Sequence, residues 1–157
     1  MILPFSTQLN GKPTEFVGKI WSGFIENKLV PFYHDILNNF NLEIVDVIGR
    51  KPKLHTIRKD EKNRWKPGVL IDFFINVRKK DMFRFAPRLP VVSIQTIKIF
   101  HLPKSDNINV YVDERRLKED EIAILAINDG FESVDDFKTY FNEDFIGKLI
   151  HWTNLKY

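Results

Sequence analysis

The chain has 157 residues, of which 43% are apolar and 13% aromatic, enough to bury the core of one domain but too few for several. It contains no cysteine, which excludes disulfides and thiolate metal sites, and no apolar run of the roughly 18 residues that a membrane helix needs. Its net charge of +3 and the lack of a basic, apolar leader predict a soluble, cytoplasmic, non-exported protein with no membrane partner.

The first predicted element is a helix over residues 14–26. Pro13 suits its first turn, and apolar side chains recur behind it at helical spacing: Phe16, Val17, Ile20, Trp21, Phe24 and Ile25. Residues 29–49 are ambiguous: residues 33–39 could form a short helix and residues 42–48 a strand that stops at Gly49. Residues 69–77 alternate between apolar and mixed positions, and residues 108–112 do the same, so both segments are predicted to be strands.

The apolar pattern of residues 91–101 changes phase. Val92 and Ile94 share one parity, whereas Ile97 and Ile99 share the other. A β-bulge near Gln95 would explain the change, because a bulge adds one residue to a strand and helps to curve a sheet.

Two helices and a last strand complete the chain. A helix over residues 118–127 is predicted to end at Gly130, which can adopt the left-handed conformation at a helix end. Ser133, with Asp136 three residues later, is a capping signal for a second short helix. Residues 146–153 are predicted to form the closing strand. This order predicts an α+β fold around a small, curved, largely antiparallel sheet.

Charge is unevenly distributed along the chain. Residues 50–66 contain eight basic and two acidic residues, whereas residues 113–144 contain eleven acidic and four basic ones. A concentrated basic surface favours a polyanionic partner. The alternative is that the two segments neutralise each other across the fold. Because the four histidines are scattered and no phosphate-binding glycine loop is present, we expect neither a metal nor a cofactor.

Several spaced motifs occur in the order typical of one known family. They are Lys53-x-x-Thr56-x-Arg58, Trp65-x-x-Gly68, Asp129-Gly130-Phe131, Tyr140-Phe141 and a final segment from Gly147 to Trp152. In these residues the chain resembles the ASCH domain family of the PUA-like superfamily. The resemblance implies a single ASCH-like domain: a small PUA-like β-barrel with flanking helices over residues 50–157, and an N-terminal helical extension over residues 1–49 that packs on the barrel.

The resemblance also implies a function connected with RNA or modified nucleosides. Some ASCH proteins are amidohydrolases that deacylate N-acetylated cytidine. Their pattern assigns catalytic positions to Lys53, Thr56 and Arg58, with Asp129 as the acid. In that pattern Thr56 is the nucleophile, Lys53 the base and Arg58 an electrostatic stabiliser. The family's acid is a glutamate, and Asp129 is one methylene shorter.

On an extended backbone Thr56 and Arg58 share a face, while Lys53 points to the other side. The three side chains therefore converge only if the chain turns near Pro52.

The same basic segment offers a nucleic-acid-binding surface. We assign it to Lys53, Arg58, Arg64, Trp65 and Lys66, because cations flanking an aromatic ring suit an unpaired base. Alternatively, Trp65 caps one end of the barrel. The leading hypothesis is thus an RNA- or nucleoside-binding domain, with the amidohydrolase as its rival. A third reading is a protein-interaction domain whose acidic helices contact a basic protein partner.

Overall fold

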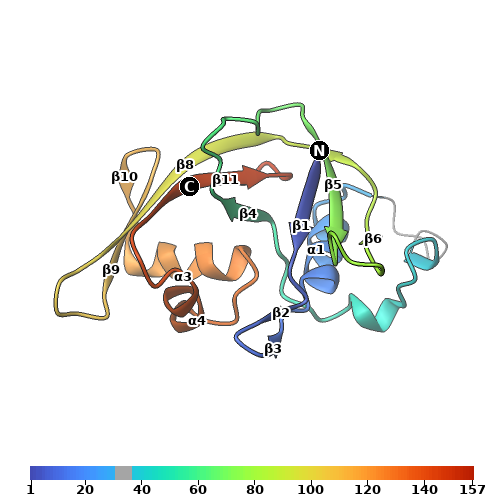
Figure 1. Ribbon diagram of the computed structural model, residues 1–157, viewed down its shortest axis with the longest axis horizontal. Coiled ribbons are helices and arrows are strands. Elements are labelled where there is room, and N and C mark those ends of the chain that lie inside the picture. Colours follow the sequence, from blue (N-terminus) through green and yellow to red (C-terminus); the bar gives the residue numbers. More distant parts are fainter. Residues whose placement is uncertain (31–36) are drawn as a thin grey trace.

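The computed structural model describes residues 1–30 and 37–157, and this part of the chain is a mixture of α-helices and β-strands (Figure 1). The short helix considered for residues 33–39 falls mostly on residues 31–36, which lie outside the described residues. The strand considered for residues 42–48 is wrong, because this segment contains a turn of 3-10 helix at Ile44–Asp46. The elements in chain order are β1 (Ile2–Phe5), β2 (Gln8–Leu9), β3 (Lys12–Pro13), α1 (Phe16–Glu26), a 3-10 helix (Ile44–Asp46), β4 (His55–Arg58), β5 (Leu70–Ile75), β6 (Phe83–Arg84), β7 (Leu89–Pro90), β8 (Ser93–His101), β9 (Ile108–Val112), β10 (Arg115–Arg116), α3 (Glu119–Asn128), α4 (Val134–Tyr140) and β11 (Phe145–His151).

Two main sheets organise the fold. The larger has the order β10-β9-β8-β11-β4 with antiparallel neighbours throughout, which leaves β4 at one edge. In the smaller sheet β5 pairs in parallel with β1 and antiparallel with β6 and β7. The α+β prediction is therefore confirmed. Neither sheet closes into a barrel within residues 1–30 and 37–157, so the predicted closed barrel is not observed.

The apolar residues form two cores that meet at the five-stranded sheet. One core joins β1, α1 and β5 to the end of β11 through Phe5, Trp21, Phe73, Ile150 and other side chains. The other joins β8 and β9 to the helices α3 and α4. Figure 1 shows α3 and α4 below the left half of the sheet and α1 behind β1 and β5 on the right.

The two cores explain the phase change in β8. Its register with β11 is continuous from Ser93 to Ile99, and its register with β9 is continuous from Ile97 to His101. The predicted bulge near Gln95 is therefore wrong. Ile94 packs against the first core, whereas Ile97 and Ile99 belong to the second. The strand is unbroken, but its first residues face the first core with one side and its later residues face the second core with the opposite side. The apolar residues therefore change from even to odd positions.

The N-terminal segment contributes both a strand and buried side chains to the first core. β1 pairs with β5, residue for residue, from Ile2↔Asp72 to Phe5↔Ile75. Phe5 stacks on Phe73, with ring centroids 6.0 Å apart, and packs edge-on against Trp152. Residues 1–49 therefore supply a strand as well as the predicted helix, here α1.

Candidate functional site

The structure brings together two side chains that the sequence motifs singled out, Lys53 and Asp129. The Lys53 ammonium donates to Asp129 Oδ1 at 2.9 Å and also to the backbone carbonyl oxygen of Asp129. Both groups are buried, with 1% and 7% of their side chains exposed. Backbone hydrogen bonds hold the Lys53 segment in place, from Lys53 N–H to the Lys19 carbonyl and from Leu54 N–H to the Asn128 carbonyl.

The Asp129 carboxylate also binds the free edge of β4. Its Oδ1 accepts the Ile57 backbone N–H at 3.1 Å and lies 3.5 Å from His55 Nδ1. Asp129 can reach this edge because α3 ends here and Gly130 turns the chain with φ +91°. A Cβ at residue 130 would lie 2.8 Å from Phe16 Cε1 and 3.0 Å from Lys53 Cδ, so only glycine fits.

Burial perturbs the titration of this cluster. Loss of water lowers the pKa of Lys53 to about 8, although the Asp129 charge acts in the opposite direction. Burial alone would raise the pKa of Asp129, but Lys53 and His55 hold it below its ordinary value. Burial likewise lowers the pKa of His55. Strongly perturbed groups with specific charged partners are typical of functional sites, although structural ion pairs also produce them.

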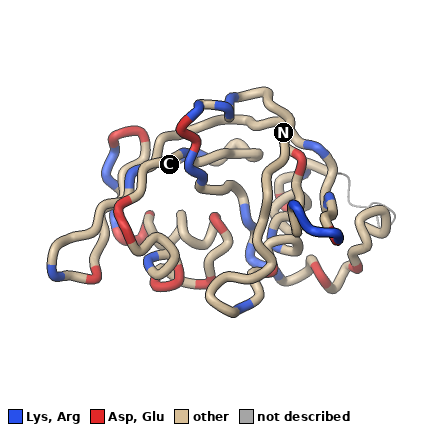
Figure 2. The backbone as a smooth tube through the Cα atoms, viewed as in Figure 1, with Lys and Arg blue, Asp and Glu red and all other residues tan. Residues whose placement is uncertain are grey.

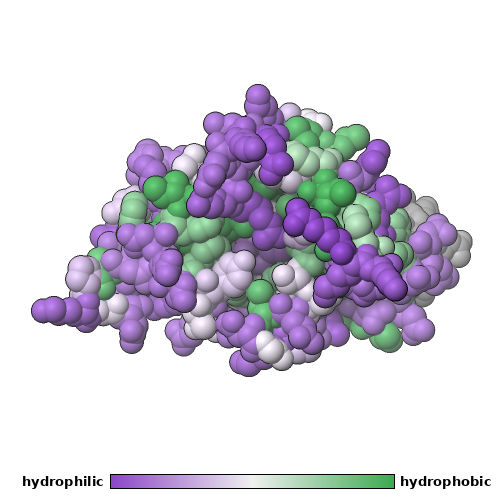
Figure 3. Space-filling model, viewed as in Figure 1, coloured by the Kyte–Doolittle hydropathy of each residue, from purple (hydrophilic) through white to green (hydrophobic). Residues whose placement is uncertain are grey.

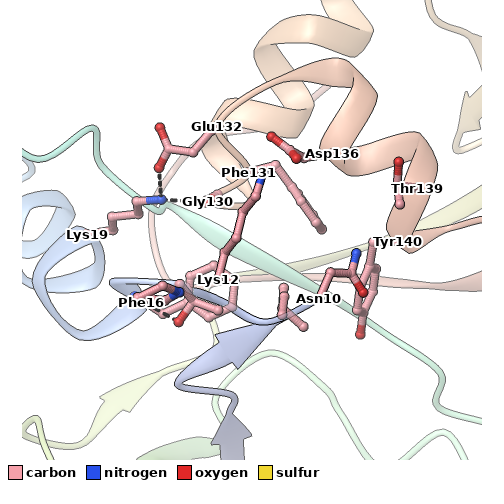
Figure 4. Close-up of a pocket in the computed structure, with 13 residues that line it drawn as sticks. Asn10, Lys12, Phe16, Lys19, Gly130, Phe131, Glu132, Asp136, Thr139 and Tyr140 are labelled. Atoms are coloured by element: carbon pink, nitrogen blue, oxygen red, sulfur yellow. Dashed lines mark hydrogen bonds and ion pairs between the residues drawn. The ribbon is translucent and has the colours of Figure 1, made fainter.

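A cavity of about 370 Å³ lies next to this cluster; we call it the first cavity. It opens between the β2–β3 hairpin, α1 and α4, and its lining includes Lys12, Phe16, Lys19, Gly130 and Tyr140 (Figure 4). Lys53 stands directly behind the wall, because its Nζ lies 4.6 Å from the Phe16 ring centroid and its Cδ is close to Gly130.

Lys19 connects the helix α1 to the opposite wall of the first cavity. Its ammonium donates to the Gly130 carbonyl at 2.8 Å and forms an ion pair with Glu132, as the dashed lines in Figure 4 mark. Tyr140 reaches the cavity from the end of α4, with 43% of the residue exposed. Its ring packs against Phe131 and Phe141 at centroid distances of 5.5 and 4.9 Å, which limits its freedom to rotate.

Thr56 and Arg58 lie on the face of β4 opposite to that of His55 and Ile57. Arg58 Nη2 donates to the Pro4 carbonyl at 2.7 Å, so this face is directed toward β1. Thr56 shares the parity of Arg58 and is 2% exposed. Within the described part of the chain, no hydrogen bond joins the Thr56 hydroxyl to Lys53 or Asp129. Arg58 is nevertheless close enough for its charge to lower the pKa of Lys53.

The remaining residues predicted to bind nucleic acid, Arg64, Trp65 and Lys66, differ in solvent exposure. Arg64 and Lys66 are exposed, but Trp65 is only 5% exposed and packs in the first core. Asp60 holds this turn by accepting the backbone N–H groups of Arg64 and Trp65, each at 3.0 Å. Trp65 therefore presents no ring face to a base. It has a structural role in the first core, although the described residues form no closed barrel for it to cap.

Mutual neutralisation of the basic and acidic segments is limited. Among the described residues, Lys53–Asp129 is the one Lys or Arg ion pair that joins residues 50–66 to residues 113–144.

Sequence reasoning missed most of the residues that line the first cavity, although the Asp129-Gly130-Phe131 motif included two of them. Phe16 was assigned to the apolar stripe of the predicted helix over residues 14–26, and Tyr140 was named as part of the Tyr140-Phe141 motif. A signal for Lys19 was present, because a lysine in the middle of an apolar helix, here 4% exposed, requires a buried partner.

No family model, curated protein or solved structure matches this chain. No helix in residues 1–30 or 37–157 combines the length and apolar character needed to cross a membrane. The same residues contain no group of three His, Asp or Glu side chains arranged to hold a metal ion.

Proposed function

We propose that the protein is an ASCH-like domain that binds RNA or a modified nucleoside, with a base entering the first cavity. The observation that carries this proposal is the buried Lys53–Asp129 ion pair directly behind the cavity wall. It unites the Lys-x-x-Thr-x-Arg and Asp-Gly-Phe segments, two motifs of the resemblance that are 76 residues apart between Lys53 and Asp129. The two sheets would together represent the curved sheet of the PUA-like superfamily.

The composition of the cavity wall supports a nucleoside as the ligand. Phe16 and Tyr140 supply aromatic surface, and stacking of a base on an aromatic side chain contributes about 1–3 kcal/mol. Lys12 and Lys19 supply cations, and Glu132 and Asp136 supply acceptors for an exocyclic amine. Such a mixture of apolar wall and few polar groups is typical of small-molecule sites, and its volume is at the lower end of their range.

A thermal-shift screen tests the proposal. Free nucleosides, N4-acetylcytidine and short RNAs are added to the protein, and a ligand that binds the folded state raises its melting temperature by mass action. Tyr140→Ala should weaken nucleoside binding about tenfold, in line with the loss of one stacking contact, whereas Tyr140→Phe should bind like the wild type. The absence of a shift with every nucleoside and RNA would refute the proposal.

A second candidate function is hydrolysis of the amide of N-acetylated cytidine. The specific observation in its favour is the Lys53 ammonium, whose pKa is lowered to about 8 by burial, although the neighbouring Asp129 carboxylate acts to raise it. A base must be neutral to accept a proton, and the lowered pKa makes neutral Lys53 accessible near physiological pH.

In that reaction Thr56 attacks the acetyl carbonyl, Lys53 takes the hydroxyl proton, and Arg58 stabilises the oxyanion. That proton then passes from Lys53 through Asp129, acting as a shuttle, to the leaving amine, and water hydrolyses the acetyl ester of Thr56. This route requires the Thr56 hydroxyl to reach Lys53 around the edge of β4, since the two groups lie on different faces.

Release of cytidine from N4-acetylcytidine tests the hydrolase. Its rate should rise with pH through about 8 as Lys53 loses its proton, and Thr56→Ala and Lys53→Met should both abolish it. Thr56→Ser, which keeps the hydroxyl, is the matched control and should remain active. Equal activity of wild type and Thr56→Ala would exclude Thr56 as the nucleophile.

A further inference from the structure

Three cavities adjoin one another across one side of the molecule. Tyr140 lines both the first cavity and a second one of about 630 Å³, which lies between β4 and the start of β11. Arg58 lines the second cavity and also a third, of about 540 Å³, between the end of β1 and the β5–β6 turn. Because Tyr140 is common to the linings of the first and second cavities, and Arg58 to those of the second and third, the three cavities follow one another on this side of the molecule, and we refer to them together as the groove.

Arg58 is placed to bind an anion in this groove. Its guanidinium lies 5.4 Å from the Phe5 ring centroid, and its one hydrogen bond among the described residues goes to the Pro4 carbonyl. No carboxylate of the described residues lies within ion-pair distance of it, and its buried Nε has no partner. An arginine fixed by an aromatic ring and a carbonyl, with N–H donors left over, suits a phosphate oxygen.

The third cavity ends at a basic turn. Lys79 lines it, and the neighbouring Arg78 and Lys80 are also exposed. None of the three forms an ion pair with a described residue. Figure 2 shows this turn as a continuous blue segment at the front of the molecule. In Figure 3 the same side carries a hydrophilic band that extends from the top of the molecule, where the loop between β4 and β5 lies, toward this turn.

The middle of the groove, between the first and third cavities, differs in charge. The second cavity contains the carboxylates Glu143 and Asp144 beside Lys59. Asp144 is engaged by the backbone N–H of His101 at 2.8 Å. Arg58 borders the same cavity as these carboxylates, so the cations that lack an ion-pair partner among the described residues lie from Arg58 onward, on the side of the third cavity.

We propose that the groove from Tyr140 past Arg58 to Lys79 and Lys80 binds the phosphate backbone of single-stranded nucleic acid, whose terminal or unpaired base occupies the first cavity. This inference rests on the proposed function and narrows its ligand from a free nucleoside to an oligonucleotide. Base recognition and backbone binding are then assigned to different side chains, Tyr140 for the first and Arg58, Lys79 and Lys80 for the second.

Fluorescence anisotropy with labelled oligonucleotides of one to six nucleotides tests the groove. Affinity should rise with length until the groove is filled, and it should fall with salt because each neutralised phosphate releases counterions. For a single strand the slope of log K against log salt changes by about 0.7 per phosphate, so the double variant Lys79→Gln/Lys80→Gln should flatten it by about 1.4. The matched control Lys28→Gln/Lys104→Gln removes two exposed lysines that line none of the three cavities and should leave the slope unchanged.

Parallel measurements identify the ligand and separate the possible failures. Affinities for single-stranded RNA and single-stranded DNA of the same sequence show which of the two nucleic acids is bound. A higher affinity for either one supports binding in the groove. Mononucleotide binding without any gain from added nucleotides would overturn the groove but leave the first cavity as a nucleoside site. Two outcomes would show that binding depends only on the net charge of the protein: equal weakening by both double variants, or equal binding of heparin and oligonucleotide. Either outcome would also overturn the groove. Failure of every nucleoside and oligonucleotide would remove the proposed function as well.

Discussion

The ion pair between Lys53 and Asp129 provides the sharpest test of the site. Asp129→Asn keeps the size of the side chain and an oxygen that can accept the Ile57 N–H, but it removes the negative charge 2.9 Å from the Lys53 ammonium. Lys53 would then be a buried cation without a counter-charge, at 1% side-chain exposure. We expect a loss of roughly 3–5 kcal/mol in the free energy of unfolding at pH 7, the usual cost of breaking one partner of a buried pair.

The dependence of this loss on pH follows from the Lys53 pKa. In the wild type that pKa is lowered from 10.5 to about 8, so between these values the unfolded chain binds more protons and stability rises with pH. Without Asp129 the pKa falls further, and the folded variant escapes the buried charge by releasing the proton. The difference between the variant and the wild type should therefore shrink by about 1 kcal/mol from pH 7 to pH 9.

Urea denaturation at pH 7 and pH 9 measures both effects, and a thermal scan at pH 7 should show a melting temperature lower by roughly 6–20 °C. Lys53→Met/Asp129→Asn serves as the control, because it removes the unpaired cation and should recover most of the stability at pH 7. An Asp129→Asn protein within about 1 kcal/mol of the wild type, or a double variant no better than the single one, would show that the pair is not energetically coupled.

Three further predictions concern the framework of the site, each measured by urea denaturation. Gly130→Ala should cost more than about 1 kcal/mol, because φ is +91° and the new Cβ would lie 2.8 Å from Phe16; a neutral effect would contradict this geometry. Ser133→Ala should cost about 1 kcal/mol, since the Ser133 hydroxyl accepts the Asp136 N–H at the start of α4, and an unchanged midpoint would mean that the cap contributes nothing. Trp65→Ala should lower the free energy of unfolding by about 3–5 kcal/mol, whereas Arg64→Ala, at its exposed neighbour, should change it by no more than about 0.5 kcal/mol. The opposite order would contradict the burial of Trp65.

Much of the secondary structure was readable from local patterns. The predicted helix over residues 14–26 is α1, and the strand predicted for residues 108–112 coincides with β9. The end of α3 at Gly130 and the capping of α4 by Ser133 were also correct. These signals act over a few residues, through apolar periodicity and backbone hydrogen bonds, so they depend little on the rest of the fold.

Partners distant in sequence were beyond such reasoning. β1 has only four residues, and its parallel partner β5 begins at Leu70. Neither its length nor its pattern distinguishes it from a loop that contains Ile2, Leu3 and Phe5. The uninterrupted strand β8 looked bulged because the sequence does not reveal that different cores cover its two faces.

For the candidate site, the chain itself determined which chemical groups are available: an amine, a hydroxyl, a guanidinium and an acid in two motif segments. Only the tertiary structure decided which of them meet. Asp129 reaches Lys53 and the edge of β4 because α3 ends beside that edge, while the alternation of β4 turns Thr56 and Arg58 toward β1. Side-chain type is a property of one position, but burial and contact depend on what packs against that position, and here the packing elements are distant in sequence.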